Sequence, residues 1–292
     1  MAGPLPPNLL PDTATIGADG RLAIGGCDVL DLAAEHGTPL FVYDEAHLRA
    51  RCREAVEAFG DSAVYATKAF LCTAMAQLVH EEGMRLDVAT GGELFVARRA
   101  GGPADRLVMH GNNKSEAELA EALDAGVGRL VVDSFEEIER IEALVAAGHP
   151  VPRVHVRITP GVEAHTHEFV RTGQDDSKFG FGVRSGDAKR AVQRVAASPA
   201  LDLVGLHCHI GSQVFRVESY TEAMEVVAAF AAPFDLPELS VGGGLGVGFG
   251  RGVGRIGLGR IGAALGDGVQ GGDEVGGALG GLLGVVHGLD LL

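Results

Sequence analysis

The chain has 292 residues, of which 46% are hydrophobic and 22% are charged, an ordinary composition for a soluble globular protein with a large core. Its formal net charge of −15 argues against a nucleic acid or an anionic membrane surface as the main partner. The four cysteines form no C-x-x-C pair, which favours reduced thiols over a disulfide framework or a zinc site.

The N-terminal segment lacks the pattern of a targeting signal. Residues 1–7 (Met-Ala-Gly-Pro-Leu-Pro-Pro) contain no basic region followed by an apolar core. No apolar run reaches the ~18 residues that a membrane-spanning helix requires. We therefore expect a cytoplasmic protein without a membrane anchor.

Short apolar runs alternate with amphipathic stretches from about residue 38 to residue 247. Apolar residues at three- and four-residue spacing predict helices between the strands, for example over 45–59 and 135–147. Ser134, with Glu137 three residues later, predicts a capping box at the start of the second of these helices. The strand candidates are 40–44, 63–68, 85–89, 107–110, 130–133, 154–158, 204–210 and 239–241.

Strands that alternate with helices in this way predict an α/β protein with a parallel sheet. The number of strands favours a (β/α)8 barrel of the TIM type, and a doubly wound open sheet is the alternative. Polar residues at strand ends have two explanations. Strand ends are more exposed to water than strand centres, and in a barrel they also converge on one mouth, where active sites are built. Six proposed strands end in a polar side chain: Lys68, Asp87, His110, Asp133, Arg157 and His209.

Lys68 follows a β-branched and aromatic run that predicts a buried strand, where an ammonium group is costly to bury. A half-buried lysine at the C-terminal end of a strand has the position that a Schiff-base nucleophile needs. Most lysines in such places instead extend their charge into solvent, so Lys68 alone does not define a site.

Two later segments complete a candidate cofactor site. The run Gly242-Gly-Gly244 directly follows a strand, where it predicts either a phosphate cradle of backbone N–H groups or a tight turn. His209 is either a ring that stacks on a planar cofactor or a core histidine that the backbone satisfies. Ser212, next to Gly211, could donate its hydroxyl to the same anion. A Schiff-base lysine, a stacking ring and a phosphate cradle together describe a pyridoxal phosphate site.

Six motifs in a fixed order carry a family resemblance, and they cover about residues 28–247 together with the similar segment 35–44. The motifs are Tyr65-Ala-Thr-Lys-Ala69, Leu86-Asp-Val-Ala-Thr-Gly-Gly-Glu-Leu94, His110-Gly-Asn-Asn-Lys-Ser115, Asp176-Ser-Lys-Phe-Gly180, Gly205-Leu-His-Cys-His-Ile-Gly-Ser-Gln213 and Gly242-Gly-Gly-Leu-Gly246. They resemble the diaminopimelate decarboxylases, pyridoxal-phosphate enzymes of the alanine-racemase-like barrel fold. The resemblance implies a homodimeric lyase of amino-acid biosynthesis that converts meso-diaminopimelate to L-lysine with loss of carbon dioxide.

The resemblance also implies a role for each matching residue. Lys68 would join the cofactor as a Schiff base, and His209 would stack on the face of its pyridine ring. Asp87 and Glu93 would orient the lysine and the polar edge of the cofactor. The phosphate would be held by Ser212 and by the three glycines Gly242, Gly243 and Gly244.

Two further residues have roles away from the cofactor in this resemblance. Arg157 would support the site from behind, and Lys178 would lie near the partner subunit. A strand-end arginine and a loop lysine are also commonly just solvated, so these two roles rest on the resemblance alone. No metal site is predicted.

The family's C-terminal features are not found in the sequence after Val247. The resemblance implies a Glu-Pro-Gly-Arg motif on the last barrel strand, a β-domain with a Cys-Glu segment, and a late tyrosine on the phosphate. In residues 248–292, 17 of 45 residues are glycine and there is no proline, lysine or tyrosine, which predicts a disordered tail. We therefore expect a truncated or frame-shifted chain whose barrel lacks its last strand, and an inactive or nearly inactive protein.

The sequence thus predicts three segments: a lead over 1–37, an incomplete pyridoxal-phosphate-binding barrel over 38–247, and a glycine-rich tail over 248–292. In the resemblance, residues 40–44 belong to the β-domain, which leaves seven barrel strands and two unpaired edges. Two alternative functions stay open. One is a related barrel decarboxylase for arginine, ornithine or a carboxylated polyamine, and the other is a non-catalytic barrel that binds pyridoxal phosphate.

Overall fold

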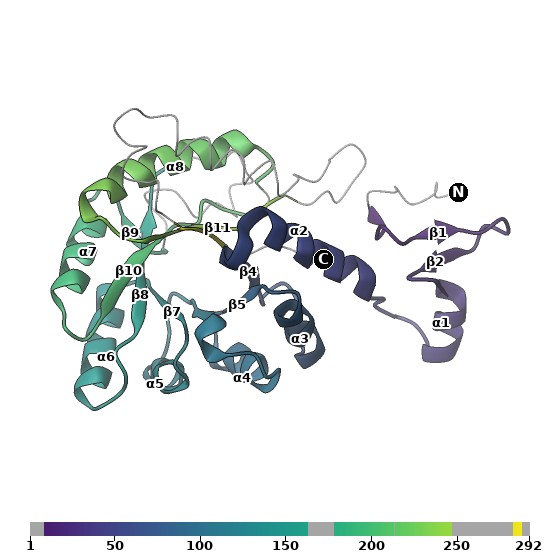
Figure 1. Ribbon diagram of the computed structural model, residues 1–292, viewed down its shortest axis with the longest axis horizontal. Helices are drawn as coiled ribbons and strands as arrows, with labels where there is room; N and C mark the ends of the chain where they lie inside the picture. Colours follow the sequence, from purple (N-terminus) through teal and green to yellow (C-terminus); the bar gives the residue numbers. More distant parts are fainter. Residues whose placement is uncertain (1–8, 163–177, 213, 247–282, 288–292) are drawn as a thin grey trace.

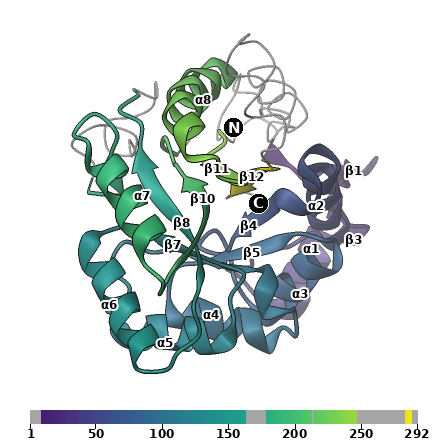
Figure 2. The same cartoon turned by 60° about the vertical axis from the view of Figure 1, so that its left-hand side comes forward.

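Eight parallel strands form a closed ring, and helices cover its outside (Figure 1 and Figure 2). The computed structural model describes residues 9–162, 178–212, 214–246 and 283–287. The predicted (β/α) barrel is confirmed, and the strand ends agree with the sequence prediction to within a few residues. The ring consists of β4 (Ala63–Ala66), β5 (Arg85–Val88), β6 (Leu107–Met109), β7 (Arg129–Val132), β8 (Arg153–Thr159), β10 (Asp202–His207), β11 (Glu238–Gly242) and β12 (Leu283–His287). The two-residue strand β9 (Phe181–Gly182) pairs with β8 outside the ring.

The closing strand β12 corrects the expectation that the last barrel strand is missing. Its backbone pairs in parallel with β11 on one side and with β4 on the other. Closure pairs the two edges that a seven-stranded sheet would leave open. The segment Leu283-Gly-Val-Val-His287 contains two β-branched residues in a row, which favour a strand. The high glycine content of the tail as a whole concealed this local signal. The rest of the predicted tail lies outside the described residues.

Seven helices pack around the ring, and most begin at a side chain that caps their first turn. Thr90, Ser115 and Ser134 each accept a hydrogen bond from the backbone N–H three residues later. The helices are α2 (Glu45–Phe59), α3 (Thr73–Glu81), α4 (Gly91–Arg99), α5 (Glu116–Ala125), α6 (Phe135–Ala146), α7 (Asp187–Ala197) and α8 (Val217–Ala231), with 3-10 turns η2 (Gly60–Ser62), η3 (Ala104–Arg106) and η5 (Ala232–Phe234). No helix of the described part is long and apolar enough to cross a membrane.

The capping box predicted at Ser134 forms only in part. The Ser134 hydroxyl accepts from the backbone N–H of Glu137 at 3.2 Å, as expected. The Glu137 carboxylate, however, accepts from the N–H of Asp133 at 2.9 Å, one residue before the cap. A complete capping box is found instead at Ser115 and Glu118.

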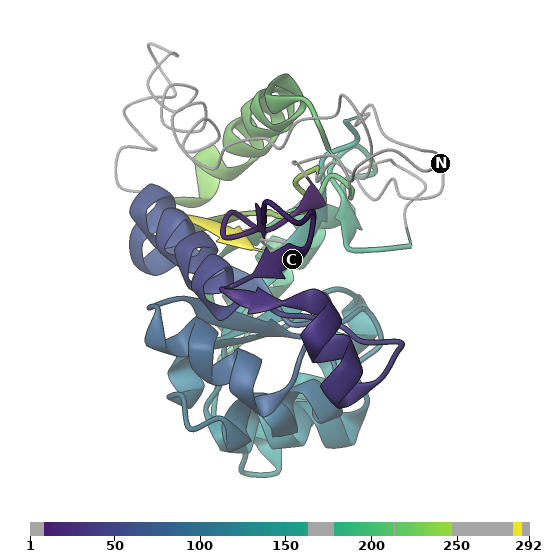
Figure 3. The same ribbon diagram turned by 90° about the vertical axis from the view of Figure 1, so that its right-hand side faces the viewer.

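The N-terminal lead folds as a small unit outside the ring, at the far end of α2 (Figure 1 and Figure 3). It contains α1 (Val29–His36) and an antiparallel sheet of β1 (Thr15–Ile16), β2 (Leu22–Ile24) and β3 (Cys27–Asp28). The strand expected over residues 40–44 is not formed, and no described strand pairs with this segment. The side chains of residues 40–43 are exposed, and Phe41 is 83% accessible, whereas Asp44 is buried.

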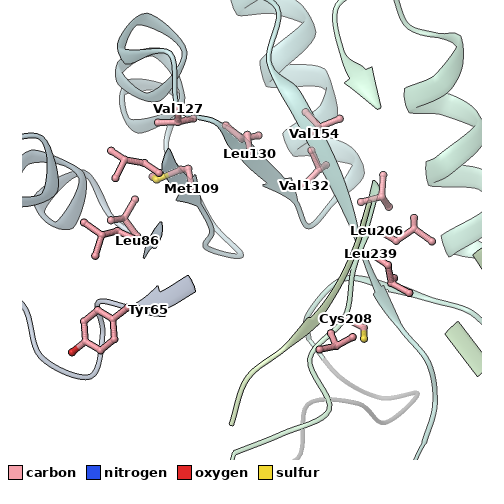
Figure 4. Close-up of a cluster of buried hydrophobic side chains, with 14 of the residues drawn as sticks. Tyr65, Leu86, Met109, Val127, Leu130, Val132, Val154, Leu206, Cys208 and Leu239 are labelled. Carbon is pink, nitrogen blue, oxygen red and sulfur yellow. The ribbon is translucent and has the colours of Figure 1, made fainter. Parts of the chain in front are cut away.

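Two apolar layers stabilise the barrel, one on each face of the sheet. Side chains that alternate along a strand point to opposite faces, so Val64, Val108 and Val131 form a small cluster on the inner face. Their chain neighbours join the larger core between the strands and the helices. Figure 4 shows part of that core, with Tyr65, Leu86, Met109 and Leu130 following one another from strand to strand.

The N-terminal end of the barrel is closed by a buried ionic cluster around Glu238. Its Oε2 accepts from Arg129 Nε at 2.6 Å and lies 2.7 Å from His155 Nε2. Gly205 faces this residue across the strand pair, and a Cβ there would lie 2.4 Å from the Glu238 carbonyl oxygen. Only glycine fits at that position, which lets β10 and β11 approach over the cluster.

Candidate active site

A cavity of about 320 Å³ opens at the C-terminal ends of the strands. This is the end of a parallel barrel at which functional groups converge, as the polar strand ends predicted. The structure brings nine of the ten predicted site residues to its wall. They are Lys68, Asp87, Glu93, Arg157, His209, Ser212, Gly242, Gly243 and Gly244.

Lys68 lies in the turn that follows β4, and the backbone holds this turn in place. The N–H and the hydroxyl of Thr67 both donate to the carbonyl oxygen of Asp87, at 3.0 and 2.7 Å. The lysine is exposed to the cavity rather than half-buried as expected, because β4 ends two residues earlier, at Ala66. Its amine therefore reaches a ligand in the cavity without crossing the core.

Asp87, near the end of β5, lines the cavity together with Lys68. Its Oδ1 makes no hydrogen bond with another described residue and lies 3.9 Å from His110 Nε2. Burial raises the pKa of Asp87 to about 7, although the charge of Lys68 opposes the rise. This carboxyl group can therefore hold or release a proton near neutral pH.

Glu93 and Arg157 are each held by a neighbour at a strand end. Glu93 Oε2 accepts from the N–H of Ala89 at 2.6 Å, directly after β5. Arg157 Nη1 donates to Asp133 Oδ2 at 3.0 Å, and its guanidinium group lies 4.5 Å from the centre of the Phe179 ring. Both side chains are thus fixed before any ligand binds, as a preorganised site requires.

His209 packs against the glycine run at the end of β11. Burial lowers the pKa of His209 to about 3, and the charges of Arg157 and Lys68 act in the same direction. The ring is therefore neutral at pH 7, which suits stacking on a planar molecule. A Cβ at Gly242 would lie 2.9 Å from Nδ1 of this ring, and one at Gly244 would lie 3.1 Å from its Cε1.

Gly244 shows most clearly why this run must be glycine. Its φ is +88°, and a Cβ would lie 1.9 Å from the carbonyl oxygen of Gly211. Its carbonyl oxygen accepts from the N–H of Val214 at 2.8 Å, so the run lies directly beside the segment that carries His209 and Ser212. The bare backbone forms a surface that a phosphate group can approach closely.

Sequence reasoning missed His207 and placed His110 at the barrel mouth without giving it a role, and both line the cavity. Their rings meet edge to face with centroids 4.5 Å apart, and His207 Nδ1 lies 2.6 Å from Ser240 Oγ. His207 could have been found, because it precedes His209 by two residues and so shares its side of the strand. Phe179 and Asn112 also line the cavity, each inside a motif of the resemblance.

Lys178 is the one predicted residue that does not line the cavity. It is exposed, and its Nζ lies 5.2 Å from the centre of the Phe179 ring. Its expected place near a partner subunit stays a prediction.

The cavity fits pyridoxal phosphate on the chemistry of its wall. It offers a reachable amine, a neutral ring that can stack, a carboxyl group with a pKa near neutrality, and a run of three glycines that leaves bare backbone on the wall. In such a site Lys68 would hold the aldehyde carbon, His209 the ring face, and Ser212 with the glycine run the phosphate.

Comparisons with known proteins agree with this chemistry. Residues 45–266 match the family described as pyridoxal-dependent decarboxylase, pyridoxal binding domain. The diaminopimelate decarboxylase of Mycobacterium tuberculosis is 48% identical over 257 residues, which is 84% of this chain and 58% of that protein. The Bacillus subtilis enzyme of the same name is 46% identical over 240 residues, or 78% of this chain and 54% of that protein. The chain thus spans little more than half the length of these relatives.

Solved structures show the same fold. The diaminopimelate decarboxylase of M. jannaschii superposes with a TM-score of 0.86 at 28% identity, covering 96% of this chain and 67% of that one. The Helicobacter pylori enzyme in complex with L-lysine has a TM-score of 0.79 at 29% identity, covering 89% and 65%. The family match extends over most of the barrel and the cavity residues lie within it, so the chain belongs to the pyridoxal-dependent decarboxylases through their pyridoxal-binding domain.

Proposed function

We propose that the cavity holds pyridoxal phosphate on Lys68 and serves the decarboxylation of meso-diaminopimelate to L-lysine. The observation that carries this proposal is the meeting of Lys68, His209 and the glycine run in one cavity at the strand ends. The names of relatives at 41–49% identity and the L-lysine in the Helicobacter pylori complex support this choice of substrate. We also infer a cytoplasmic protein that acts on a free amino acid and assembles as a homodimer, with Lys178 near the partner subunit.

The cofactor, when bound, supplies an electron sink for the electron pair that remains on the α-carbon after carbon dioxide leaves. The residues of this chain position it and manage protons. Lys68 would offer the amine that holds the aldehyde, and Asp87 can exchange a proton beside that amine near neutral pH. His209, being neutral, presents a flat face without adding positive charge to the ring.

The carboxylates on the described cavity wall are Asp87 and Glu93. Glu93 Oε2 is engaged by the Ala89 N–H at 2.6 Å, and Asp87 neighbours Lys68. In the resemblance, a further carboxylate comes from the Glu-Pro-Gly-Arg motif. Loss of one such preorganised electrostatic partner typically costs about 10²–10³ in rate. That the 292 residues alone decarboxylate slowly or not at all stays a prediction, and it is independent of whether they bind the cofactor.

The proposal is tested by product analysis with purified chain, pyridoxal phosphate and separate candidate amino acids. We expect any product to be L-lysine from meso-diaminopimelate, with none from arginine or ornithine. The variant Lys68→Ala should remove this activity. Release of agmatine or putrescine from arginine or ornithine would assign the chain to another substrate. Turnover that persists in Lys68→Ala would refute the proposed site.

A further inference from the structure

Lys114 is a fully buried lysine that lies behind the cavity and not on its wall. Its side chain is 0% accessible, and it follows the β6 strand in the loop that leads to α5. The ammonium group donates to the carbonyl oxygen of Gly111 at 2.6 Å and to that of Val131 at 2.8 Å. It also lies 2.6 Å from Glu137 Oε1. Three groups from three different segments thus meet on one ammonium group.

Glu137 completes a buried ion pair, with 3% of its side chain accessible. Its second oxygen, Oε2, accepts from the N–H of Asp133 at 2.9 Å. Burial raises the pKa of Glu137 above its usual range, and the charge of Lys114 opposes the rise, so the carboxylate depends on its partner for its ionised state. Each residue of the pair therefore needs the other.

The pair reaches the cavity along two routes. Through the carbonyl oxygen of Gly111 it holds the loop whose residues Gly111 and Asn112 form part of the wall. Through the backbone of Asp133 it holds the end of β7.

Asp133 carries the second route onward. Its Oδ2 accepts from Arg157 at 3.0 Å, and its Oδ1 accepts from the N–H of Gly180 at 2.8 Å, next to Phe179. Arg157 and Phe179 both line the cavity. Neither side chain of the pair lines the cavity itself, although the charge of Lys114 acts to lower the pKa of Asp87 on the wall.

We propose that Lys114 and Glu137 form a positioning pair that sets the cavity wall after β6, β7 and β8 for the bound cofactor. The inference rests on the proposed function, because the wall is the one assigned to pyridoxal phosphate. A buried ion pair contributes little net stability compared with apolar side chains of the same volume. The presence of this pair behind the cavity is therefore explained better by the geometry that it imposes on Gly111 and Asp133 than by stability.

The test separates stability from geometry with the double variant Lys114→Met/Glu137→Leu. It removes both charges and fills the same space with apolar atoms, so the unfolding midpoint should return close to that of the unchanged chain. The single variant Glu137→Gln, which leaves Lys114 charged, should be less stable than the double variant. Glu238→Gln is the matched control, because it breaks a buried ion pair at the opposite end of the barrel.

Cofactor affinity is measured by titration with pyridoxal phosphate, followed by the visible absorption of its Schiff base. We expect the double variant to bind about tenfold more weakly despite its restored stability, the low end of what lost supporting contacts cost at metal sites. Glu238→Gln should keep the affinity of the unchanged chain despite its lower stability. A double variant with unchanged affinity would overturn the inference.

A second measurement needs no cofactor. Amide hydrogen exchange should become faster in the double variant at residues 110–115 and 178–182, and stay unchanged in α2. Unchanged exchange in both loops would overturn the inference even if no form of the chain bound pyridoxal phosphate. Faster exchange in these loops, with no absorption from the unchanged chain, would support the positioning pair and refute the proposed cofactor.

Discussion

Asp87 illustrates how one residue in the cavity couples fold and chemistry. It is close to a cation, yet burial outweighs that attraction and its pKa rises to about 7. The folded protein thus retains a proton on this carboxyl group over a pH range in which the unfolded chain has released it. Because the group is costly to ionise in place, it is suited to hold a proton beside Lys68.

The variant Asp87→Asn should change how stability depends on pH. In the unchanged chain the raised pKa makes the folded state bind more protons than the unfolded state between pH 4 and pH 7. The contribution of Asp87 to the unfolding free energy should therefore fall by about 4 kcal/mol as the pH rises through this window. Asn should remove this slope. Urea unfolding at several pH values measures it, and identical slopes in both proteins would contradict the pKa assignment.

Gly244 makes a second test at a single position. Gly244→Ala places a Cβ 1.9 Å from the Gly211 carbonyl oxygen, so the segment with His209 and Ser212 must move and cofactor binding should be lost. Gly126→Ala is the control: its φ is +70° but nothing lies within 4 Å. It should cost only the left-handed strain of about 1–2 kcal/mol and leave binding unchanged. Equal binding in both variants would contradict the cradle.

In two barrel helices, a glutamate in the first turn binds the backbone at the end of the preceding strand, and the sequence spacing reveals this contact only in part. Glu93 in α4 and Glu137 in α6 are each three residues after the helix cap, and each accepts from the N–H four residues earlier. The spacing of Ser134 and Glu137 predicted a box closed within the helix. The strand end competes successfully for the carboxylate, because its N–H group also needs a partner. Sequence spacing therefore located this helix start but not the role of Glu137.

The β11 strand carries its own pH dependence through Glu238. Burial would raise the pKa of this group, but the hydrogen bonds from His155 and Arg129 outweigh burial and lower it to about 2. Its stabilising effect should be complete above pH 4.5 and decline as the pH falls towards 2. Glu238→Gln should cost about 3–5 kcal/mol at neutral pH, because Arg129 stays buried without a carboxylate. Urea unfolding at pH 6 and pH 3 checks this, and an equal loss at both pH values would contradict it.

For the whole molecule, alternation of apolar runs and amphipathic stretches predicted the barrel and the approximate positions of its strands. The polar residues at strand ends predicted the cavity, because topology alone brings those ends together. What could not be predicted depends on contacts distant in sequence. β12 pairs with β4 across more than 200 residues, and no described strand pairs with the 40–44 segment. Nor could a local motif reveal that Lys114 turns away from the cavity.

Closure of the ring by β12 has a consequence for the entire fold. Val286 pairs with Gly242 on one side and with Ala63 on the other. Val286→Pro removes a backbone N–H from this ladder and should lower the unfolding midpoint by several degrees. The matched change Val286→Thr keeps the N–H and should have a smaller effect. An unchanged midpoint for the proline variant would show that the ring does not depend on this strand.

The cofactor site is tested at atomic level by borohydride reduction of the chain with pyridoxal phosphate, followed by peptide mass spectrometry. Reduction fixes the Schiff base, so the modified lysine can be read from the peptide that carries the added mass. The site described above predicts the label on Lys68 at one equivalent per chain, and none in Lys68→Ala. A label distributed over Lys178 and Lys189, or absent from Lys68, would show that the cavity does not hold pyridoxal phosphate.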